Sequence, residues 1–220
     1  MQVRLYNFMK YLLFLLMALC LLLGACSQQQ PLKLEADVVN TAVSVMQERI
    51  ASYTQWDMQM RIALRHDKLS WRGIMQWTQR EDEFAMTFND MLGRRLMLIE
   101  SQSDGSVLAI DSKGRQTRAS NPSVLIKSML GTEVPVESLH YWLLGAPAPG
   151  ESYFGIEFDA QGRLQFYKQS DWTISYTDYR DDDCLDWSPA SLTLSRAQTQ
   201  LWLHIRSLQT PTSVVKTSAC

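Results

Sequence analysis

The stretch DMQMRIALRHDKLSWRGIMQW, residues 57–77, decides the fold because its apolar side chains recur with a period of two. In the first run these side chains alternate with Asp57, Gln59, Arg61 and Arg65, and the tripeptide His66-Asp67-Lys68 separates it from a second run. This alternation is typical of strands with one buried face, and a short polar insert joins antiparallel neighbours. We therefore predict a β-hairpin, whose apolar phase consists of Met58, Met60, Ile62, Leu64, Leu69, Trp71, Met75 and Trp77.

The same alternation continues through most of the chain, with turn formers between the runs. The further runs are Phe84/Met86/Phe88, Leu96/Leu98, Val107/Ala109, Ile156/Phe158, Trp172/Ile174/Tyr176, Leu192/Leu194 and Leu201/Leu203/Ile205. Helical periodicity replaces it in three places: residues 35–50, a segment from Asn121-Pro122 to Gly131, and residues 136–144 before Gly145. We predict a mainly β (α+β) fold, in which one antiparallel sheet curves into an incomplete barrel covered by helices.

The N-terminus carries a short apolar run that is uncharged from Tyr11 to Ala25 and follows Arg4 and Lys10. A spanning helix needs roughly 20 residues, so this run fits a cleaved secretory signal better than an anchor. Cleavage is expected before Cys26. The sequence Leu-Gly-Ala-Cys at residues 23–26 resembles the bacterial lipobox, which implies that Cys26 carries acyl chains; at ~0.8 kcal/mol per buried methylene, more than one chain makes a stable anchor. The alternative is an ordinary signal with an incidental cysteine.

These features divide the chain into residues 1–25 as signal peptide, 26–34 as lipidated tether, 35–208 as a single domain, and 209–220 as a polar C-terminal tail without an assigned role. Loss of Arg4 and Lys10 leaves 19 basic against 23 acidic side chains, a net charge of −4. Such a chain has no basic field for nucleic acid. Cys184 and Cys220 could pair in an oxidising compartment or remain free.

Motifs for chemistry are missing from the sequence. The histidines His66, His140 and His204 have no partner at metal-ligand spacing, and no CxxC, GxSxG, Walker or GxGxxG pattern occurs. The acidic clusters at residues 81–83 and 181–183 lie between strands, where solvated turn charges are common. We therefore predict no metal, no cofactor and no enzymatic activity; a distant pair of catalytic carboxylates is the alternative.

The inward phase of the first strands is rich in methionine and aromatic side chains. Methionine is flexible and polarisable, and suits variable apolar ligands. A curved sheet with such a lining could enclose a cavity for acyl chains, although composition alone favours an ordinary packed core. The residues of the predicted acyl-binding cavity are Met58, Met60, Met75, Trp77, Phe84, Met86 and Phe88.

A second candidate site lies in the segment from Phe88 to Arg95. The turn formers Asn89, Asp90 and Gly93 bracket Met91 and Leu92, which should therefore project at a hairpin tip. An apolar tip beside two arginines could enter a bilayer surface or engage a partner. Single exposed leucines are common, however, and an incidental surface pair is the alternative.

Four segments of the chain carry a resemblance to a known family. They read SLHYWLLGAPAPG at 138–150, FDAQGRL at 158–164, DWTISY at 171–176 and PASLTL at 189–194. In this order and spacing they resemble the LolB family of outer-membrane lipoprotein receptors, and the lipobox, the early helix and Trp71-Arg72-Gly73 fit as well. The resemblance covers nearly the whole chain after the signal peptide.

The resemblance implies an incomplete antiparallel β-barrel in which a helical lid and an N-terminal helix enclose a hydrophobic cavity. It also implies that triacylated lipoproteins are accepted from the periplasmic carrier LolA and inserted into outer-membrane phospholipid of a Gram-negative bacterium. The family's exposed leucine, commonly in an Asn-Pro-Leu-Gly context, matches Leu92, where Asp90-Met91 replaces the loop-stiffening proline. We expect a monomer anchored by lipid, with its domain facing the periplasm and residues 122–144 as the lid. A lipid-anchored envelope scaffold without transfer activity is the alternative.

Overall fold

The computed structural model describes residues 35–182 and 186–210. The predicted signal peptide, the tether with Cys26, the cysteines Cys184 and Cys220, and nearly all of the C-terminal tail lie outside these residues. Within them, no helix is long and apolar enough to cross a membrane.

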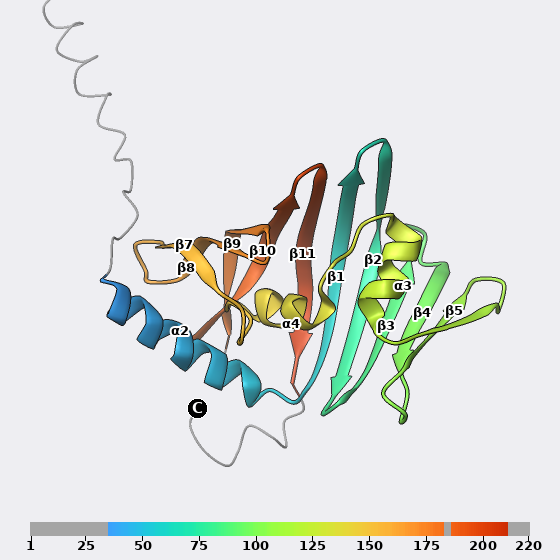
Figure 1. The fold of residues 1–220 in the computed structure, drawn as a ribbon, viewed down its shortest axis with the longest axis horizontal. Coiled ribbons are helices and arrows are strands. Elements are labelled where there is room, and N and C mark those ends of the chain that lie inside the picture. Colours follow the sequence, from blue (N-terminus) through green and yellow to red (C-terminus); the bar gives the residue numbers. More distant parts are fainter. Residues whose placement is uncertain (1–34, 183–185, 211–220) are drawn as a thin grey trace, which may run out of the picture. The chain divides into compact units, whose positions relative to one another are not determined.

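Eleven strands of the described chain form one antiparallel sheet in the order β6-β5-β4-β3-β2-β1-β11-β10-β9-β8-β7 (Figure 1). They are β1 (Gln55–His66), β2 (Leu69–Arg80), β3 (Glu83–Asn89), β4 (Arg95–Ser101), β5 (Val107–Asp111), β6 (Gln116–Ala119), β7 (Tyr153–Phe158), β8 (Leu164–Gln169), β9 (Trp172–Asp182), β10 (Asp186–Arg196) and β11 (Thr199–Gln209). Two meanders meet where β1 pairs with β11, and β6 and β7 are left at opposite edges. The sheet is therefore not closed, and the predicted incomplete antiparallel barrel is confirmed.

The hairpin predicted from residues 57–77 is the β1–β2 pair. Met58 lies opposite Trp77, and Met60 lies opposite Met75, so the apolar phases of both strands share one face. Asp67 in the connecting turn has a φ of 49°, a left-handed conformation that aspartate tolerates better than most side chains. Alternation thus fixes both the pairing and the buried face of this hairpin.

The phase expected for β4 was wrong. Leu96 and Leu98 were the expected alternating pair, but Met97 and Ile99 face the core, opposite Phe88 and Met86 of β3. Residues 96–99 are all apolar, so their sequence does not select a face; the register with β3, which is shifted by an irregularity beside Phe88, makes the choice.

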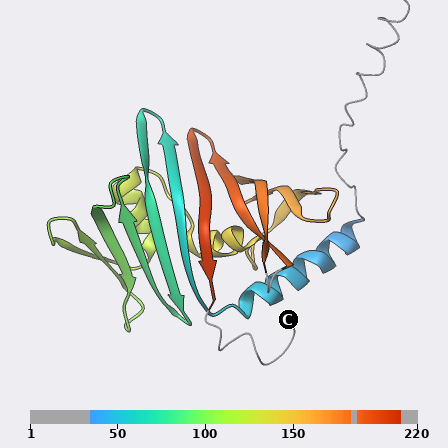
Figure 2. The ribbon, with the colours of Figure 1, turned by 180° about the vertical axis from the view of Figure 1, so that it is seen from behind.

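Three helices accompany the sheet: α2 (Ala36–Ala51), α3 (Pro122–Leu130) and α4 (Val136–Leu144). The Asn121 side chain accepts a 3.0 Å hydrogen bond from the Val124 backbone N–H at the start of α3, and Gly131 ends that helix with a φ of 71°. Both shorter helices lie in front of the sheet in Figure 1 and behind it in Figure 2, so they cover one face, called here the inner face. α2 lies beside α4 and buries Val43, Met46 and Ile50, of which Met46 and Ile50 belong to the core cluster.

The hydrophobic core lies between the inner face and the three helices. Its largest fully buried side chains include Trp56, Trp77, Trp142 and Trp172. The opposite face, called here the outer face, carries exposed Arg61, Arg65 and His204. This division follows from the two-residue period of the strands.

Candidate functional site

The structure brings the seven predicted acyl-contact residues together on β1, β2 and β3. Across these strands one row runs Met58, Trp77, Met86 and a second row runs Met60, Met75, Phe88. Those six side chains are at most 5% exposed, whereas Phe84 is partly buried against the same core cluster. They form one continuous apolar surface under the helices, and they are packed rather than open.

An aromatic cluster joins this surface to α4. The Trp56 and Trp77 rings lie 5.3 Å apart, and the imidazole of His140 packs edge-on 5.4 Å from Trp56 and 6.3 Å from Trp77. Burial lowers the pKa of His140 from its ordinary 6.5 to about 4, so the ring is neutral at pH 7. The indole Nε1 of Trp56 is buried and has no hydrogen-bond partner among the described residues. The helix therefore presents an uncharged aromatic surface to the sheet.

A polar clamp fixes the C-terminal end of α4, and Gln169 on β8 is its centre. The Oε1 atom of Gln169 accepts 2.8 Å hydrogen bonds from Trp142 Nε1 and from the Ala148 backbone N–H, while its Nε2 donates to the Ala148 carbonyl at 2.8 Å. The Tyr176 hydroxyl donates to the Trp142 carbonyl at 2.8 Å. Sequence reasoning missed Gln169; an amide on the apolar phase of a strand was the available signal.

The connection between α3 and α4 is held by hydroxyl groups. The Ser123 hydroxyl donates to the Val134 carbonyl at 2.9 Å and accepts from the Val136 backbone N–H at 3.3 Å, so it ties the two helices together. The hydroxyl groups of Thr132 and Thr199 form a 3.1 Å hydrogen bond with each other. Since Thr199 is the first residue of β11, this bond joins the connection to the β10–β11 hairpin. These bonds close the inner face, and none of the ion pairs among the described residues joins two residues of the core.

A cleft of about 560 Å³ opens beside the start of α3, between the β2–β3 and β4–β5 turns. Phe84 and Val107 belong both to its wall and to the core. Asp82, Glu83 and Glu137 stand on its wall, and none of the residues that line it is basic. This acidic cleft therefore connects the protein surface with the apolar inner face, because Phe84 and Val107 belong to both.

The predicted tip residues lie in the β3–β4 turn, at the other end of β3. Leu92 is 81% exposed and Met91 is 55% exposed. The carboxylate of Asp90 accepts hydrogen bonds from the backbone N–H groups of Leu92 at 2.9 Å and Arg94 at 3.0 Å, and from Arg94 Nε at 2.6 Å. The hydrogen bond from the Arg94 backbone is the main reason why the pKa of Asp90 is lowered. Asp90 thus orders the turn in which the family commonly has proline.

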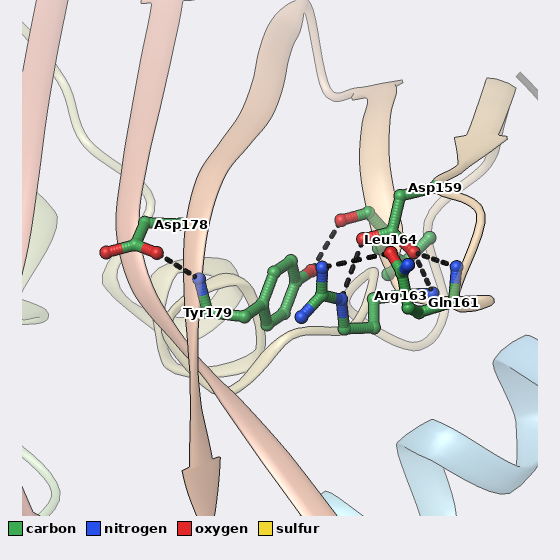
Figure 3. Close-up of polar contacts among 6 residues, drawn as sticks. All are labelled: Asp159, Gln161, Arg163, Leu164, Asp178 and Tyr179. Carbon is green, nitrogen blue, oxygen red and sulfur yellow. Dashed lines mark hydrogen bonds and ion pairs between the residues drawn. The ribbon is translucent and has the colours of Figure 1, made fainter. Parts of the chain in front are cut away.

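This turn is one of three with the same construction, which the sequence analysis did not recognise. The pattern Asp-x-x-Gly-Arg begins at Asp90, Asp111 and Asp159, and each carboxylate accepts from the backbone two and four residues later and from the arginine Nε. Figure 3 shows the copy at Asp159, where the Arg163 guanidinium also lies 4.8 Å from the Tyr179 ring. The two central residues are Met-Leu in the first copy, but Ser-Lys and Ala-Gln in the others. The scaffold is shared, and the apolar tip belongs to one copy.

An open antiparallel sheet with short helices over its apolar inner face defines the class of LolA-like half-barrels. A LolA-superfamily protein from Nitrosomonas europaea superposes with a TM-score of 0.52 over 77% of this chain and 93% of its own, at 10% identity, so the two share a fold. Residues 54–207 match the family model described as outer membrane lipoprotein LolB. Similar relatives are the outer-membrane lipoprotein LolB of Nitrosococcus oceani, 34% identical over 76% of this chain and 81% of its own, and that of Pseudomonas putida, 28% identical over 74% and 78%. The chain belongs to the LolB family.

Proposed function

We propose that the protein is an outer-membrane lipoprotein that accepts acylated lipoproteins from a LolA carrier between its lid and its inner face, and then inserts them into the outer membrane. The observation that carries this proposal is the continuous Met- and Trp-rich surface beneath two short helices in a LolB-family chain. No covalent step is needed. The direction of transfer follows from affinity: the inner face binds acyl chains more strongly than the donor does and more weakly than the bilayer.

Acceptance requires the packed inner face to open. α4 is anchored by Gln169 and Tyr176, whereas α3 borders the acidic cleft. Displacement of α3 would break the two Ser123 hydrogen bonds but would leave the anchors of α4 in place. Acyl chains would enter past Phe84 and replace the helix contacts of Met60, Met75 and Met86. Unbranched methionine side chains repack around ligands of different shape at little cost.

Delivery of the cargo to the membrane depends on the tip of the β3–β4 turn, that is, on Met91 and Leu92. In the proposed mechanism Met91 and Leu92 enter the phospholipid surface, and Asp90 holds them in an ordered turn. The two sister turns support this role because they keep the same hydrogen bonds while placing Ser-Lys and Ala-Gln, without any large apolar side chain, at the corresponding positions. Because the sister turns form without an apolar pair, the turn itself does not require Met91 and Leu92.

The anchor is proposed from the lipobox. Residues 1–25 would be removed as a signal peptide, Cys26 would carry the acyl chains, residues 26–34 would form the tether to the domain, and the domain would face the periplasm as a monomer. The polar tail at 209–220 has no role in this mechanism. The phospholipid of the outer membrane is the final acceptor of the cargo.

A scaffold protein is the competing proposal, and a transfer assay separates the two. Residues 26–220 carrying Cys26→Ala are mixed with LolA loaded with a triacylated lipoprotein and then separated from it. Movement of the cargo onto this chain supports the receptor and shows that its own anchor is dispensable for acceptance. Cargo that stays on LolA, while circular dichroism shows a folded acceptor, would favour the scaffold.

A further inference from the structure

The outer face carries a hollow of about 320 Å³ that the proposed carrier function does not use. It lies over β1, β2, β10 and β11, and its lining includes Arg61 and His204, which are exposed on the outer face. Arg61, Arg72, His204 and Trp202 stand around it, and hydroxyl groups of Ser191 and Thr193 complete its wall. Its volume is in the range of small-molecule sites.

Strand register explains why the surface is hollow at this point. Ala63 lies between Arg72 and Trp202 in one cross-strand row, and Thr193 follows Trp202. Small side chains beside large ones leave a depression in a sheet surface. The Arg65 guanidinium lies 5.6 Å from the centre of the Trp202 ring and holds the indole at the rim.

The charge of the hollow is unbalanced. Arg61 and Arg72 are exposed, and neither forms an ion pair with any described residue. No carboxylate lines the hollow, and Asp178, which is paired with Ser191 across β9 and β10, is not part of its wall. Two free guanidinium groups beside hydroxyl donors, in a chain of net charge −2, form a site for an anion. The planar fork of arginine suits phosphate oxygens.

The hollow is continuous with the tip. Met91 is one of its lining residues, so one side of the β3–β4 turn closes it. Gly73 allows this approach: a Cβ atom at residue 73 would lie 2.4 Å from the Asn89 carbonyl oxygen. A membrane touched by Leu92 would therefore meet the hollow that Met91 lines, and the exposed indole of Trp202 in that hollow is a side chain that favours the membrane interface.

We propose that this hollow binds the phosphate group of an anionic glycerophospholipid while the tip is in the bilayer. The inference rests on the proposed function for the orientation of the tip toward the membrane. Arg61 and Arg72 grip the phosphate, the Thr193 hydroxyl donates to a remaining oxygen, and Trp202 packs against the lipid glycerol. The Ser191 hydroxyl shares a 2.9 Å hydrogen bond with Nδ1 of His204 and lines the wall beside them. The headgroup thereby holds the domain on the membrane during release of the cargo.

Vesicle flotation tests the proposal. Residues 26–220 with Cys26→Ala keep every residue that the structure describes and lack the proposed acyl anchor. We expect stronger binding to phosphatidylcholine vesicles that contain phosphatidylglycerol than to phosphatidylcholine alone. Arg61→Gln and Arg72→Gln should each lower this preference about fivefold, the effect of one basic residue at an anionic surface. A double variant that combines Arg61→Gln with Arg72→Gln should lower it further. Lys113→Gln with Arg118→Gln, at residues that do not line the hollow, removes the same charge as this double variant and should leave the preference unchanged.

The proposal would be overturned if the parent showed no preference for phosphatidylglycerol vesicles, or if the control variant lost this preference as much as the arginine variants do. It would also be overturned if the parent bound vesicles charged with oleate, which carries no phosphate, as strongly as vesicles that contain phosphatidylglycerol. If soluble glycerol phosphate binds in an arginine-dependent way while the vesicle preference does not depend on the arginines, the occupant is a soluble ester and the proposal also fails. Leu92→Gln separates the two proposals, because Leu92 does not line the hollow and its replacement should weaken binding to both kinds of vesicle. If that variant binds like the parent, the tip assignment fails while the phosphate site is judged by the arginines.

Discussion

The indole Nε1 of Trp142 in α4 donates a 2.8 Å hydrogen bond to Oε1 of Gln169 in β8. Both residues are fully buried. The same amide also bonds both backbone groups of Ala148, so one side chain closes the segment that follows the helix. The C-terminal end of the lid is thus fixed to the sheet by a side chain that no motif identifies.

Replacing Gln169 with Leu should destabilise the protein strongly. The substitution leaves the Trp142 indole N–H and the Ala148 N–H and carbonyl without their partner, and a buried group left unpaired costs about 1–3 kcal/mol. We expect the free energy of unfolding to fall by about 3 kcal/mol or more in urea titrations. Gln165→Leu on the exposed face of the same strand is the matched control, and it should change the free energy little. Equal effects of the two changes would mean that the clamp does not hold the lid.

Replacing the tip pair by the Ala-Gln of the third turn should separate delivery from acceptance. Met91→Ala with Leu92→Gln keeps the Asp90 turn but removes two apolar side chains, each able to gain about 1.5–3 kcal/mol on burial in the bilayer. We expect delivery of cargo from the protein to vesicles to slow by more than tenfold, while uptake from LolA changes less than about twofold. Ser112→Ala with Lys113→Gln makes the same replacement in the sister turn at Asp111 and should affect neither step. Unchanged delivery by the tip variant would refute its role.

Gly73→Ala tests the packing of the β3–β4 turn on β2. The new methyl group would lie 2.4 Å from the Asn89 carbonyl oxygen and 2.4 Å from a carbon of the Trp71 ring. The ring can turn away, but the carbonyl belongs to the backbone and moves only with the turn. Overpacking typically costs about 1–3 kcal/mol, so we expect a lower free energy of unfolding together with slower delivery. Ser70→Ala on the same strand is the control. If Gly73→Ala lowers the free energy of unfolding no more than Ser70→Ala does, the β3–β4 turn does not pack on Gly73.

Stability should fall in acid because His140 is buried. Its pKa is about 4 in the folded protein against an ordinary 6.5, so the unfolded chain binds the proton more readily. The stabilisation is complete above pH 6.5 and is lost as the pH falls toward 4, and a pKa lowered from 6.5 to about 4 corresponds to about 3 kcal/mol.

The check is chemical denaturation between pH 7 and pH 4. His140→Phe keeps an aromatic ring against Trp56 and removes the titrating group, so its stability should decrease less over this interval than that of the parent. Parallel pH profiles would show that the imidazole is solvated in the folded state.

The sequence by itself determined the sheet and its buried face. The two-residue period from Met58 to Trp77 selects strands, and Asn121-Pro122 and Gly131 set the ends of α3 through capping that is local in the chain. The exposed position of Leu92 is local as well, because turn formers on both sides keep it out of the core. The family followed from the order of short segments, which the match over residues 54–207 confirms.

Only the tertiary structure decided the rest. Register chose Met97 and Ile99 over Leu96 and Leu98, since four consecutive apolar residues carry no phase of their own. It also placed Gln169 under Trp142, and it set Arg61 and Arg72 around Trp202 from three different strands. Such contacts join residues far apart in sequence, and a periodic pattern states which face a side chain occupies but not which neighbour it meets there.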